Sequence, residues 1–271
     1  MSQSIGIFDS GIGGLSVLKA LRAELPAEHF IYIADSGHAP YGERDDGHVI
    51  ERSLKIAAYL SKQNIKALVV ACNTATAAAV DLLRAIYPAL PIIGVEPALK
   101  PAVAVSTTKH IAVMATRSTL ASARFAALLA AHAGQARITL VPCDGLAEAI
   151  EKSAQTFNAT ELIAVCSKII GVEGTFDTSN EHKTRIDTTV LGCTHYPFAA
   201  QHIATLLGSG VQLLDTGKAV ARQTRLRLGF AASAGRGSAP VVFISSGNPA
   251  ALRAGASAWL GLTPAIKTLQ I

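Results

Sequence analysis

Charged residues, aromatic residues and uninterrupted apolar segments are all scarce in this sequence. Of its 271 residues, 16% are charged and 5% aromatic, and the net charge is +5. The Lys and Arg residues are scattered rather than gathered into blocks with interleaved aromatic residues, so we expect no nucleic-acid partner. The longest uncharged stretch, 188–214, is interrupted by two histidines, a proline and a Gly-Ser-Gly run, so we expect no membrane span.

Cysteine is also sparse. Cys72, Cys143, Cys166 and Cys193 form no C-x-x-C pair, and their density is too low for a disulfide-stapled secreted domain. Residues 1–4 carry no basic region of a secretory signal, so we expect a cytoplasmic protein with free thiols. Cys193-Thr194-His195 alone supplies too few ligands for zinc, and we expect no metal site.

Nucleotide-binding signatures are missing as well. The glycine-rich loop at residues 11–14 reads G-x-G-G, which does not fit G-x-G-x-x-G, and no G-x-x-x-x-G-K-[ST] occurs. A tight turn between a strand and a helix requires glycines in any case. The loop therefore gives little support to nucleotide binding.

The pattern that is present predicts an α/β protein. Short β-branched apolar runs alternate with segments of helical period, which is typical of a doubly wound fold with mainly parallel sheets. Similar segments around Cys72 and Cys193 suggest an internal duplication, with two lobes that face each other. Residues 171–187 and 231–239 are predicted loops. We predict strands at 4–8, 30–34, 67–71, 92–95, 110–115, 137–141, 188–192, 211–214 and 241–245, and helices at 15–25, 49–63, 75–87, 119–132 and 160–170.

Ligands of parallel sheets collect beyond the carboxyl ends of the strands, so the residues there are candidates for a site. They are Asp9 to Gly14, Asp35-Ser36, Cys72-Asn73-Thr74, Glu96-Pro97, Thr116 and Cys193-Thr194-His195. The two cysteines stand out because each follows an apolar strand and precedes a predicted helix start, which favours a thiolate. Cys166, inside a helical run, and Cys143 are interpreted as core residues.

Two thiols on facing lobes suit one particular chemistry. Racemization of an amino acid removes the α-proton on one face and returns a proton on the other, which needs two acid/base groups. His195, two residues from Cys193, could exchange a proton with that thiol or hold its charge. A Cys-His hydrolase would leave the second cysteine unexplained, and a thiol oxidoreductase normally has its cysteines close in sequence.

Other polar residues allow more than one reading. Ser10, Asn73, Thr74 and Thr194 could bind substrate carboxylates. Asp9 ends an apolar strand and needs a partner, although capping the next helix would satisfy it. Tyr41, in a Pro-Tyr-Gly turn, either packs on the surface or closes the rim of the site. Glu148 and Glu151 lie on a predicted helix after Cys143, where exposure to solvent is the default.

Five segments together resemble the glutamate racemases of the cofactor-independent aspartate/glutamate racemase superfamily, and the resemblance extends over nearly the whole chain. They are Ile5 to Leu15, Ala34 to Gly42, Ala71 to Thr76, Gly94 to Pro97 and Leu191 to Pro197. The resemblance implies two pseudo-symmetric α/β lobes with glutamate enclosed between them and no pyridoxal phosphate or metal. We expect one lobe to comprise 1–97 with 209–271 and the other 98–208.

The resemblance also implies roles for single residues. Cys72 and Cys193 become the catalytic acid/bases, acting on D- and L-glutamate respectively. Asp9 is expected to assist Cys72, whereas His195 and Glu151 assist Cys193, with Glu148 as the competitor of Glu151. The residues expected around glutamate are Asp9, Ser10, Tyr41, Gly42, Asn73, Thr74, Thr194 and His195.

The implied biology is the supply of D-glutamate for peptidoglycan synthesis in a bacterial cytoplasm, by a homodimer. The alternatives are an aspartate racemase, a related cofactor-independent amino-acid racemase, or a catalytically silent amino-acid-binding protein. The loop at 171–187 is longer and more polar than the resemblance requires, and its role is open.

Overall fold

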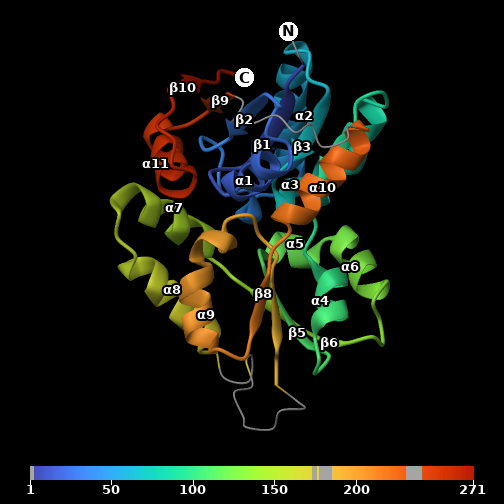
Figure 1. The fold of residues 1–271 in the computed structure, drawn as a ribbon, viewed down its shortest axis with the longest axis vertical. Helices are drawn as coiled ribbons and strands as arrows, with labels where there is room; N and C mark the ends of the chain where they lie inside the picture. The colour runs from blue at the N-terminus through green and yellow to red at the C-terminus, as the bar shows by residue number, and fades with distance from the viewer. Residues whose placement is uncertain (1–2, 173–175, 177–184, 230–239) are drawn as a thin grey trace.

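Two α/β lobes, one above the other in Figure 1, make up the molecule. The structure, a computed structural model, describes residues 3–172, 176, 185–229 and 240–271. The predicted loop 231–239 and most of the loop 171–187 lie outside the described residues. The upper lobe contains both the blue N-terminal segment and the red C-terminal segment, so the chain passes through the lower lobe and returns.

The upper, first lobe is built from a six-stranded parallel sheet and its helices. Its elements are β1 (Ile5–Asp9), α1 (Leu15–Glu24), β2 (Phe30–Ala34), η1 (Tyr41–Glu43), α2 (Asp46–Lys62), β3 (Ala67–Val70), α3 (Asn73–Ile86), β4 (Ile92–Gly94), α10 (Gly217–Leu228), β9 (Val241–Ser245), α11 (Pro249–Leu260) and β10 (Ile266–Thr268).

The second lobe has a four-stranded parallel sheet. Its elements are α4 (Leu99–Val105), β5 (His110–Ala115), α5 (Arg117–Ala121), α6 (Ala123–Ala130), β6 (Arg137–Pro142), α7 (Leu146–Thr156), α8 (Thr160–Ile170), β7 (Thr188–Leu191), η2 (Tyr196–Ala199), α9 (Ala200–Leu207) and β8 (Gln212–Leu214). The predicted α/β fold with two doubly wound lobes is confirmed.

The strand orders contain the predicted duplication. The first sheet runs β10-β9-β2-β1-β3-β4 and the second β6-β5-β7-β8, so the order β2-β1-β3-β4 recurs as β6-β5-β7-β8. In this correspondence β3 matches β7. Cys72 lies two residues beyond the end of β3, and Cys193 lies two residues beyond the end of β7. The two thiols therefore occupy equivalent places in two equivalent sheets.

Burial on both faces explains why the central strands are mostly apolar. In β1, Ile5 and Ile7 pack into a cluster with α1, α10 and α11, whereas Phe8 points into a cluster with α2 and α3. Every residue of β1, β2, β3, β5 and β7 is buried. This packing holds the carboxyl ends of the strands in fixed places at the lobe junction.

The structure corrects two sequence-based expectations about elements of the second lobe. Strand β8 pairs with β7 in the second sheet. The second lobe therefore extends past the boundary expected at residue 208. The helix predicted over 119–132 is instead two helices, α5 and α6. Ser122 interrupts them because its backbone is extended and its Oγ accepts a hydrogen bond from Phe125 N, which caps α6.

The uncharged stretch 188–214 folds into β7, η2, α9 and β8. Within the ranges that the structure describes, no helix combines the length and the apolar character that a membrane crossing requires.

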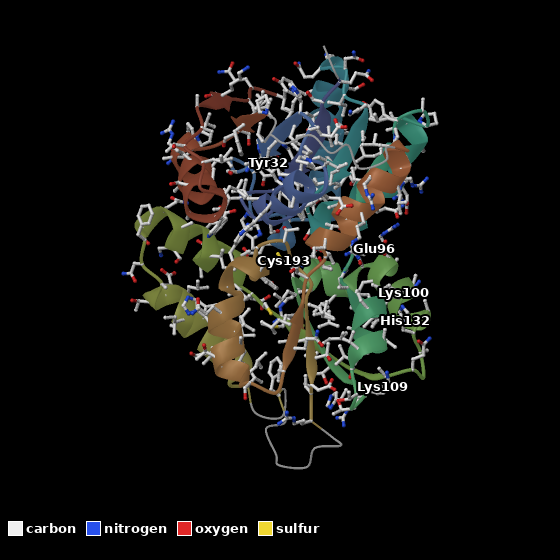
Figure 2. All side chains as sticks on the ribbon, in the orientation of Figure 1. Tyr32, Glu96, Lys100, Lys109, His132 and Cys193 are labelled. Atoms are coloured by element: carbon white, nitrogen blue, oxygen red, sulfur yellow. The ribbon has the colours of Figure 1, made fainter. Side chains whose placement is uncertain are left out.

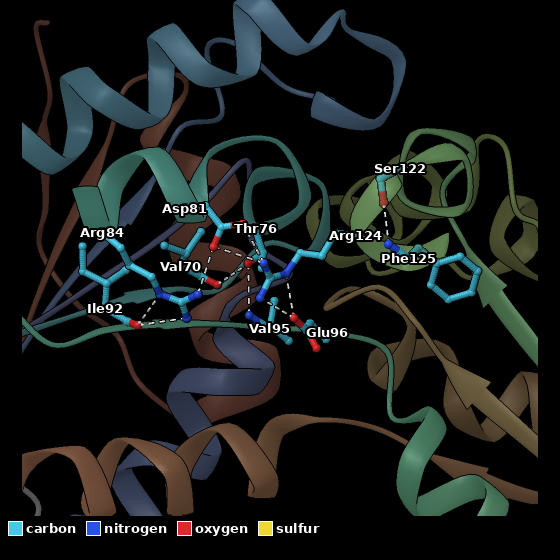
Figure 3. Close-up of polar contacts among 10 residues, drawn as sticks. All are labelled: Val70, Thr76, Asp81, Arg84, Ile92, Val95, Glu96, Ser122, Arg124 and Phe125. Carbon is cyan, nitrogen blue, oxygen red and sulfur yellow. Dashed lines mark hydrogen bonds and ion pairs between the residues drawn. The ribbon is translucent and has the colours of Figure 1, made fainter. Parts of the chain in front are cut away.

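An ion-pair network joins the lobes at the linker after β4 (Figure 3). Arg124, on α6 of the second lobe, donates from Nε to Glu96 Oε1 over 2.6 Å and from Nη1 to Asp81 Oδ2 over 3.0 Å. Asp81 belongs to α3 of the first lobe, and Arg84 donates to it from one turn further along. Arg124 thus connects the second lobe to the helix that begins directly after Cys72.

Candidate active site

A cavity of about 260 Å³ lies between the lobes, and both Cys72 and Cys193 line it. Figure 2 shows Cys193 where the two lobes meet. Because each cysteine follows a strand of a different lobe, the cavity receives one thiol from each side. The sequence-based prediction that the two cysteines belong to one site is consistent with this arrangement.

Cys72 is the N-cap residue of α3 and is 5% exposed. Its Sγ accepts a hydrogen bond from Ala75 N over 3.4 Å and lies 3.9 Å from Ser10 Oγ. Burial and the neighbouring charge of Asp9 raise the pKa of Cys72 to about 12, although the Ala75 amide works in the opposite direction. The expectation that the helix N-terminus favours a thiolate at Cys72 is wrong, because desolvation outweighs the helix amides.

Asp9, the last residue of β1, is buried and connects the lobes. Its Oδ1 accepts a hydrogen bond from Gly11 N over 2.8 Å, and its Oδ2 accepts one from Thr194 Oγ1 of the second lobe over 2.8 Å. Burial raises the pKa of Asp9, while the charge of His195 acts in the lowering direction. Asp9 therefore acts on Cys72 through its charge, and its carboxylate accepts a hydrogen bond from Thr194, the residue that follows Cys193.

Cys193 has a different set of neighbours. Its Sγ lies 3.6 Å from His195 Nδ1, and His195 Nε2 lies 2.8 Å from Glu151 Oε1. Burial alone would lower the pKa of His195, but the bonds to Cys193 and Glu151 outweigh it and raise that pKa well above 6.5. The hydrogen bond from His195 likewise keeps the pKa of Glu151 low despite burial. The sulfur and the carboxylate on either side of His195 therefore favour the protonated form of its ring.

Two glycines of the loop between β1 and α1 are explained by contacts across the lobes. A Cβ at Gly11 would collide with the Glu151 carboxylate, and a Cβ at Gly13 would collide with the His195 ring. Ile12 N donates to Glu151 Oε1 over 3.0 Å in the same region. Gly11 and Gly13 thus leave room for side chains of the second lobe. These glycines serve contact between the lobes and not the binding of a nucleotide phosphate.

Seven of the eight residues expected around the substrate line the cavity. They are Ser10, Tyr41, Gly42, Asn73, Thr74, Thr194 and His195. Asp9 lies behind the wall with no exposed surface. Tyr41 is buried, with Oη donating to Asp35 Oδ2, so the reading of Tyr41 as a surface-packing residue is wrong. Asn73 Nδ2 is buried and has no hydrogen-bond partner among the described residues, which leaves a donor for a ligand.

Several lining residues were not singled out as binding residues from the sequence. Ser36 and Thr116 follow the carboxyl ends of β2 and β5, so the strand-end rule already pointed to them. Cys143 was interpreted as a core residue, but it also lines the cavity because it follows β6 at the same rim. Arg117, Asp144 and Glu148 are found there too. Cys166 is fully buried in the core of the second lobe, as predicted.

Among the described residues, no group of three or more His, Cys, Asp and Glu side chains is placed to hold a metal ion. The groups that line the cavity are thiols, hydroxyls, an amide, carboxylates, the Arg117 guanidinium and the His195 imidazole. Such a set can bind a small dicarboxylic amino acid and move protons to and from it.

Comparison with known proteins agrees with this geometry. The family model for Asp/Glu/hydantoin racemases matches residues 5–224. A glutamate racemase of Ralstonia pickettii is 44% identical over 268 residues, covering 98% of this chain and 91% of the relative. One of Ectopseudomonas mendocina is 48% identical over 84% of each chain. The crystal structure of the glutamate racemase isoform RacE1 from Bacillus anthracis superposes with a TM-score of 0.84 at 28% identity, covering 99% and 98% of the two chains.

An Escherichia coli glutamate racemase, solved with L-glutamate and the activator UDP-MurNAc-Ala, superposes with a TM-score of 0.85 at 27% identity and covers 99% and 98%. The fold and the site together define an isomerase of the racemase class. The chain belongs to the Asp/Glu/hydantoin racemase family.

Proposed function

We propose that this protein is a glutamate racemase that interconverts L- and D-glutamate by proton transfer between two thiols. The observation that carries the proposal is the pair Cys72 and Cys193, placed at equivalent strand ends of two lobes and lining one cavity. The glutamate racemases among its relatives, 44–48% identical over most of their length, support glutamate as the substrate.

In the L-to-D direction Cys193 removes the α-proton and Cys72 supplies a proton to the opposite face. Cys72 suits the second role because burial keeps it protonated at neutral pH. The His195 imidazolium stabilises negative charge on Cys193 Sγ, and Glu151 holds that imidazolium in place. In the D-to-L direction Cys72 removes the α-proton with Asp9 as the assisting group, and Cys193 supplies a proton to the opposite face. Asn73 and the hydroxyls of Ser10, Thr74 and Thr194 are the groups proposed to bind the carboxylates.

The test is a coupled assay for D-glutamate formed from L-glutamate by purified, metal-stripped protein. We expect racemization without added cofactor, with exchange of the substrate α-proton for solvent deuterium. Cys72→Ala and Cys193→Ala should each lower kcat by at least about 10³-fold, since neither face can be served by the remaining thiol. Full activity in either single variant would contradict the mechanism.

Glu151 and Glu148 form a matched pair for the assisting role on the Cys193 side. Glu151 contacts His195, whereas Glu148 lines the cavity one turn earlier on α7. We expect Glu151→Gln to lower kcat by about 10–100-fold, because it removes the charge that raises the pKa of His195. Glu148→Gln should lower kcat less than threefold, and the reverse order would assign the assisting role to Glu148.

Aspartate is the alternative substrate, and side-by-side assay of both amino acids separates the two. Glutamate binding by calorimetry without formation of the D-enantiomer would favour a silent amino-acid-binding protein instead.

We further propose, on the family resemblance, a homodimer that supplies D-glutamate for peptidoglycan in the bacterial cytoplasm. Sedimentation equilibrium tests the dimer, and D-glutamate auxotrophy of a deletion strain tests the supply.

A further inference from the structure

Tyr32 is a fully buried tyrosine directly behind the glycine loop of the active site. It lies on β2 of the first lobe, in the apolar cluster under α1, and its ring centroid is 6.1 Å from that of Phe243. Figure 2 shows it in the body of the first lobe, away from Cys193. Its Oη donates a hydrogen bond to Gly11 O over 2.9 Å. A phenylalanine would fill the same apolar space, so the hydroxyl itself requires an explanation.

The loop that Tyr32 holds presents three consecutive amides to the site. Gly11 N donates to Asp9 Oδ1 over 2.8 Å, Ile12 N donates to Glu151 Oε1 over 3.0 Å, and Gly13 N lies 3.2 Å from His195 Nε2. These three side chains are the groups proposed to assist the two thiols. The orientation of a single peptide segment therefore sets the environment of helpers on both sides of the substrate.

We infer that Tyr32 is a positioning residue for racemization: its hydroxyl fixes the carbonyl of Gly11 and thereby aims the amides of Gly11 and Ile12 at the carboxylates of Asp9 and Glu151. The inference rests on the proposed racemase function. Tyr32 does not line the cavity, so its action passes through the loop rather than through the substrate.

Burial and the charges around Tyr32 keep its hydroxyl protonated, so it can always donate to Gly11 O. Burial, together with the charges of Asp9, Glu151 and Cys72, raises the pKa of Tyr32 well above its usual value, so the hydroxyl keeps its proton. Asp9 is faced by His195 and Glu151 from the second lobe and by Cys72 from the end of β3. The loop amides favour the ionised carboxylates, because the Gly11 amide lowers the pKa of Asp9 and the Ile12 amide lowers that of Glu151.

The test is Tyr32→Phe, which removes one oxygen and keeps the ring. We expect kcat to fall about three- to tenfold in both directions, the loss of one buried hydrogen bond, with KM changed less than twofold. Because relaxed amides would support the carboxylates less, the acidic limb of the pH profile of kcat should move to higher pH by about half a unit. A purely structural role would lower the rate equally at every pH.

The matched control is Tyr59→Phe, at a half-buried tyrosine on α2 in the other apolar cluster, and it should leave both the rate and the profile unchanged. An unchanged Tyr32→Phe profile, or a rate loss uniform in pH, overturns the inference while wild-type activity keeps the racemase proposal intact. An inactive wild type defeats the racemase proposal instead. If Tyr32→Phe does not fold, Gly11→Ala displaces the same loop from Glu151, and an unshifted acidic limb in that variant overturns the inference.

Discussion

At the scale of single residues, the two cysteines are equivalent in position and unequal in surroundings. Cys72 caps α3 by accepting a hydrogen bond from Ala75 N and is exposed to the charge of Asp9, whereas Cys193 lies beside the His195 and Glu151 pair. The two directions of proton transfer therefore start from different electrostatic states. Asp9 and Glu151 each also bond to a group of the opposite lobe, so neither half of the site is complete within one lobe.

The high pKa of Cys72 predicts a distinctive alkylation profile. With a pKa of about 12, the thiolate fraction at pH 8 is about 10⁻⁴, so modification by iodoacetamide should be slow and should accelerate about tenfold per pH unit up to pH 10. Mass spectrometry of the peptide containing Cys72 measures the rate, with circular dichroism to confirm folding at each pH. A rate that levels off below pH 9 would show that the pKa of the Cys72 thiol is much lower and would contradict the prediction.

At the scale of elements, η1 is held in place by a buried ion pair beneath it. Arg52, on α2, binds both carboxylate oxygens of Asp35 at 2.9 Å, and Tyr41 Oη of η1 donates to the same carboxylate over 2.6 Å. Burial alone would raise the pKa of Asp35, but the bonds from Arg52, Ser246 and Tyr41 outweigh it and lower that pKa. The hydrogen bond from Tyr41 to Asp35 therefore holds the Pro-Tyr-Gly turn at the cavity. The sequence showed only that Asp35 follows a strand.

Arg52→Met should destabilise the protein by about 3 kcal/mol at pH 7, since it leaves a buried carboxylate without its cation. The lowered pKa of Asp35 means that the pair stabilises the fold above the unfolded pKa near 4 and that this stability is lost as the pH falls through the folded pKa. In the variant, burial raises the pKa of Asp35, so protonation relieves the cost at low pH. Urea unfolding at pH 7 and pH 5 should show a smaller difference from wild type at pH 5.

The double variant Arg52→Met with Asp35→Asn is the control for this prediction. It removes the uncompensated charge and should recover part of the lost stability at pH 7. A difference from wild type that is the same at both pH values would show that lost packing, and not the charge of Asp35, causes the effect.

At the scale of the whole molecule, the site exists only where the lobes meet. The chain enters the second lobe after β4 and returns before α10, and Arg124 spans this junction to Glu96 and Asp81 (Figure 3). Because Arg124 is 28% exposed and Asp81 is 77% exposed, these ion pairs are screened by solvent. Their role is to set the relation of the lobes rather than to supply much stability.

Arg124→Met should accordingly lower the free energy of unfolding by no more than about 1 kcal/mol, a Tm change of about 2–4 °C that shrinks in 1 M salt. We also expect KM for glutamate to rise by about two- to fivefold, because α3, which carries Asn73 and Thr74, then keeps the Thr74–Thr116 hydrogen bond but loses its ion pair to the second lobe. Lys55→Met, which breaks an exposed pair with Glu51 inside α2, is the control and should leave KM unchanged. Equal KM values in the two variants would mean that the network does not set the lobe junction.

The sequence by itself determined the alternation of elements, the two cysteine positions and most of the cavity lining. Apolar strands and amphipathic helices are local patterns, and parallel strands bring their carboxyl ends to one rim whatever the remaining details. That is why Ser10, Asn73, Thr74 and Thr194 could be named from their places after strands, and why Thr116 stood on the same rim.

Only the tertiary structure decided which distant residues meet. It placed Glu151 rather than Glu148 against His195, linked Asp9 to Thr194, brought Cys143 to the cavity and assigned β8 to the second sheet. These contacts join residues far apart in the chain, so no local pattern encodes them. The pKa of Cys72 shows the same difference between sequence and structure. The sequence shows that Cys72 lies at a helix N-terminus, which lowers the pKa of a thiol. Burial in the folded protein raises that pKa and is the larger effect.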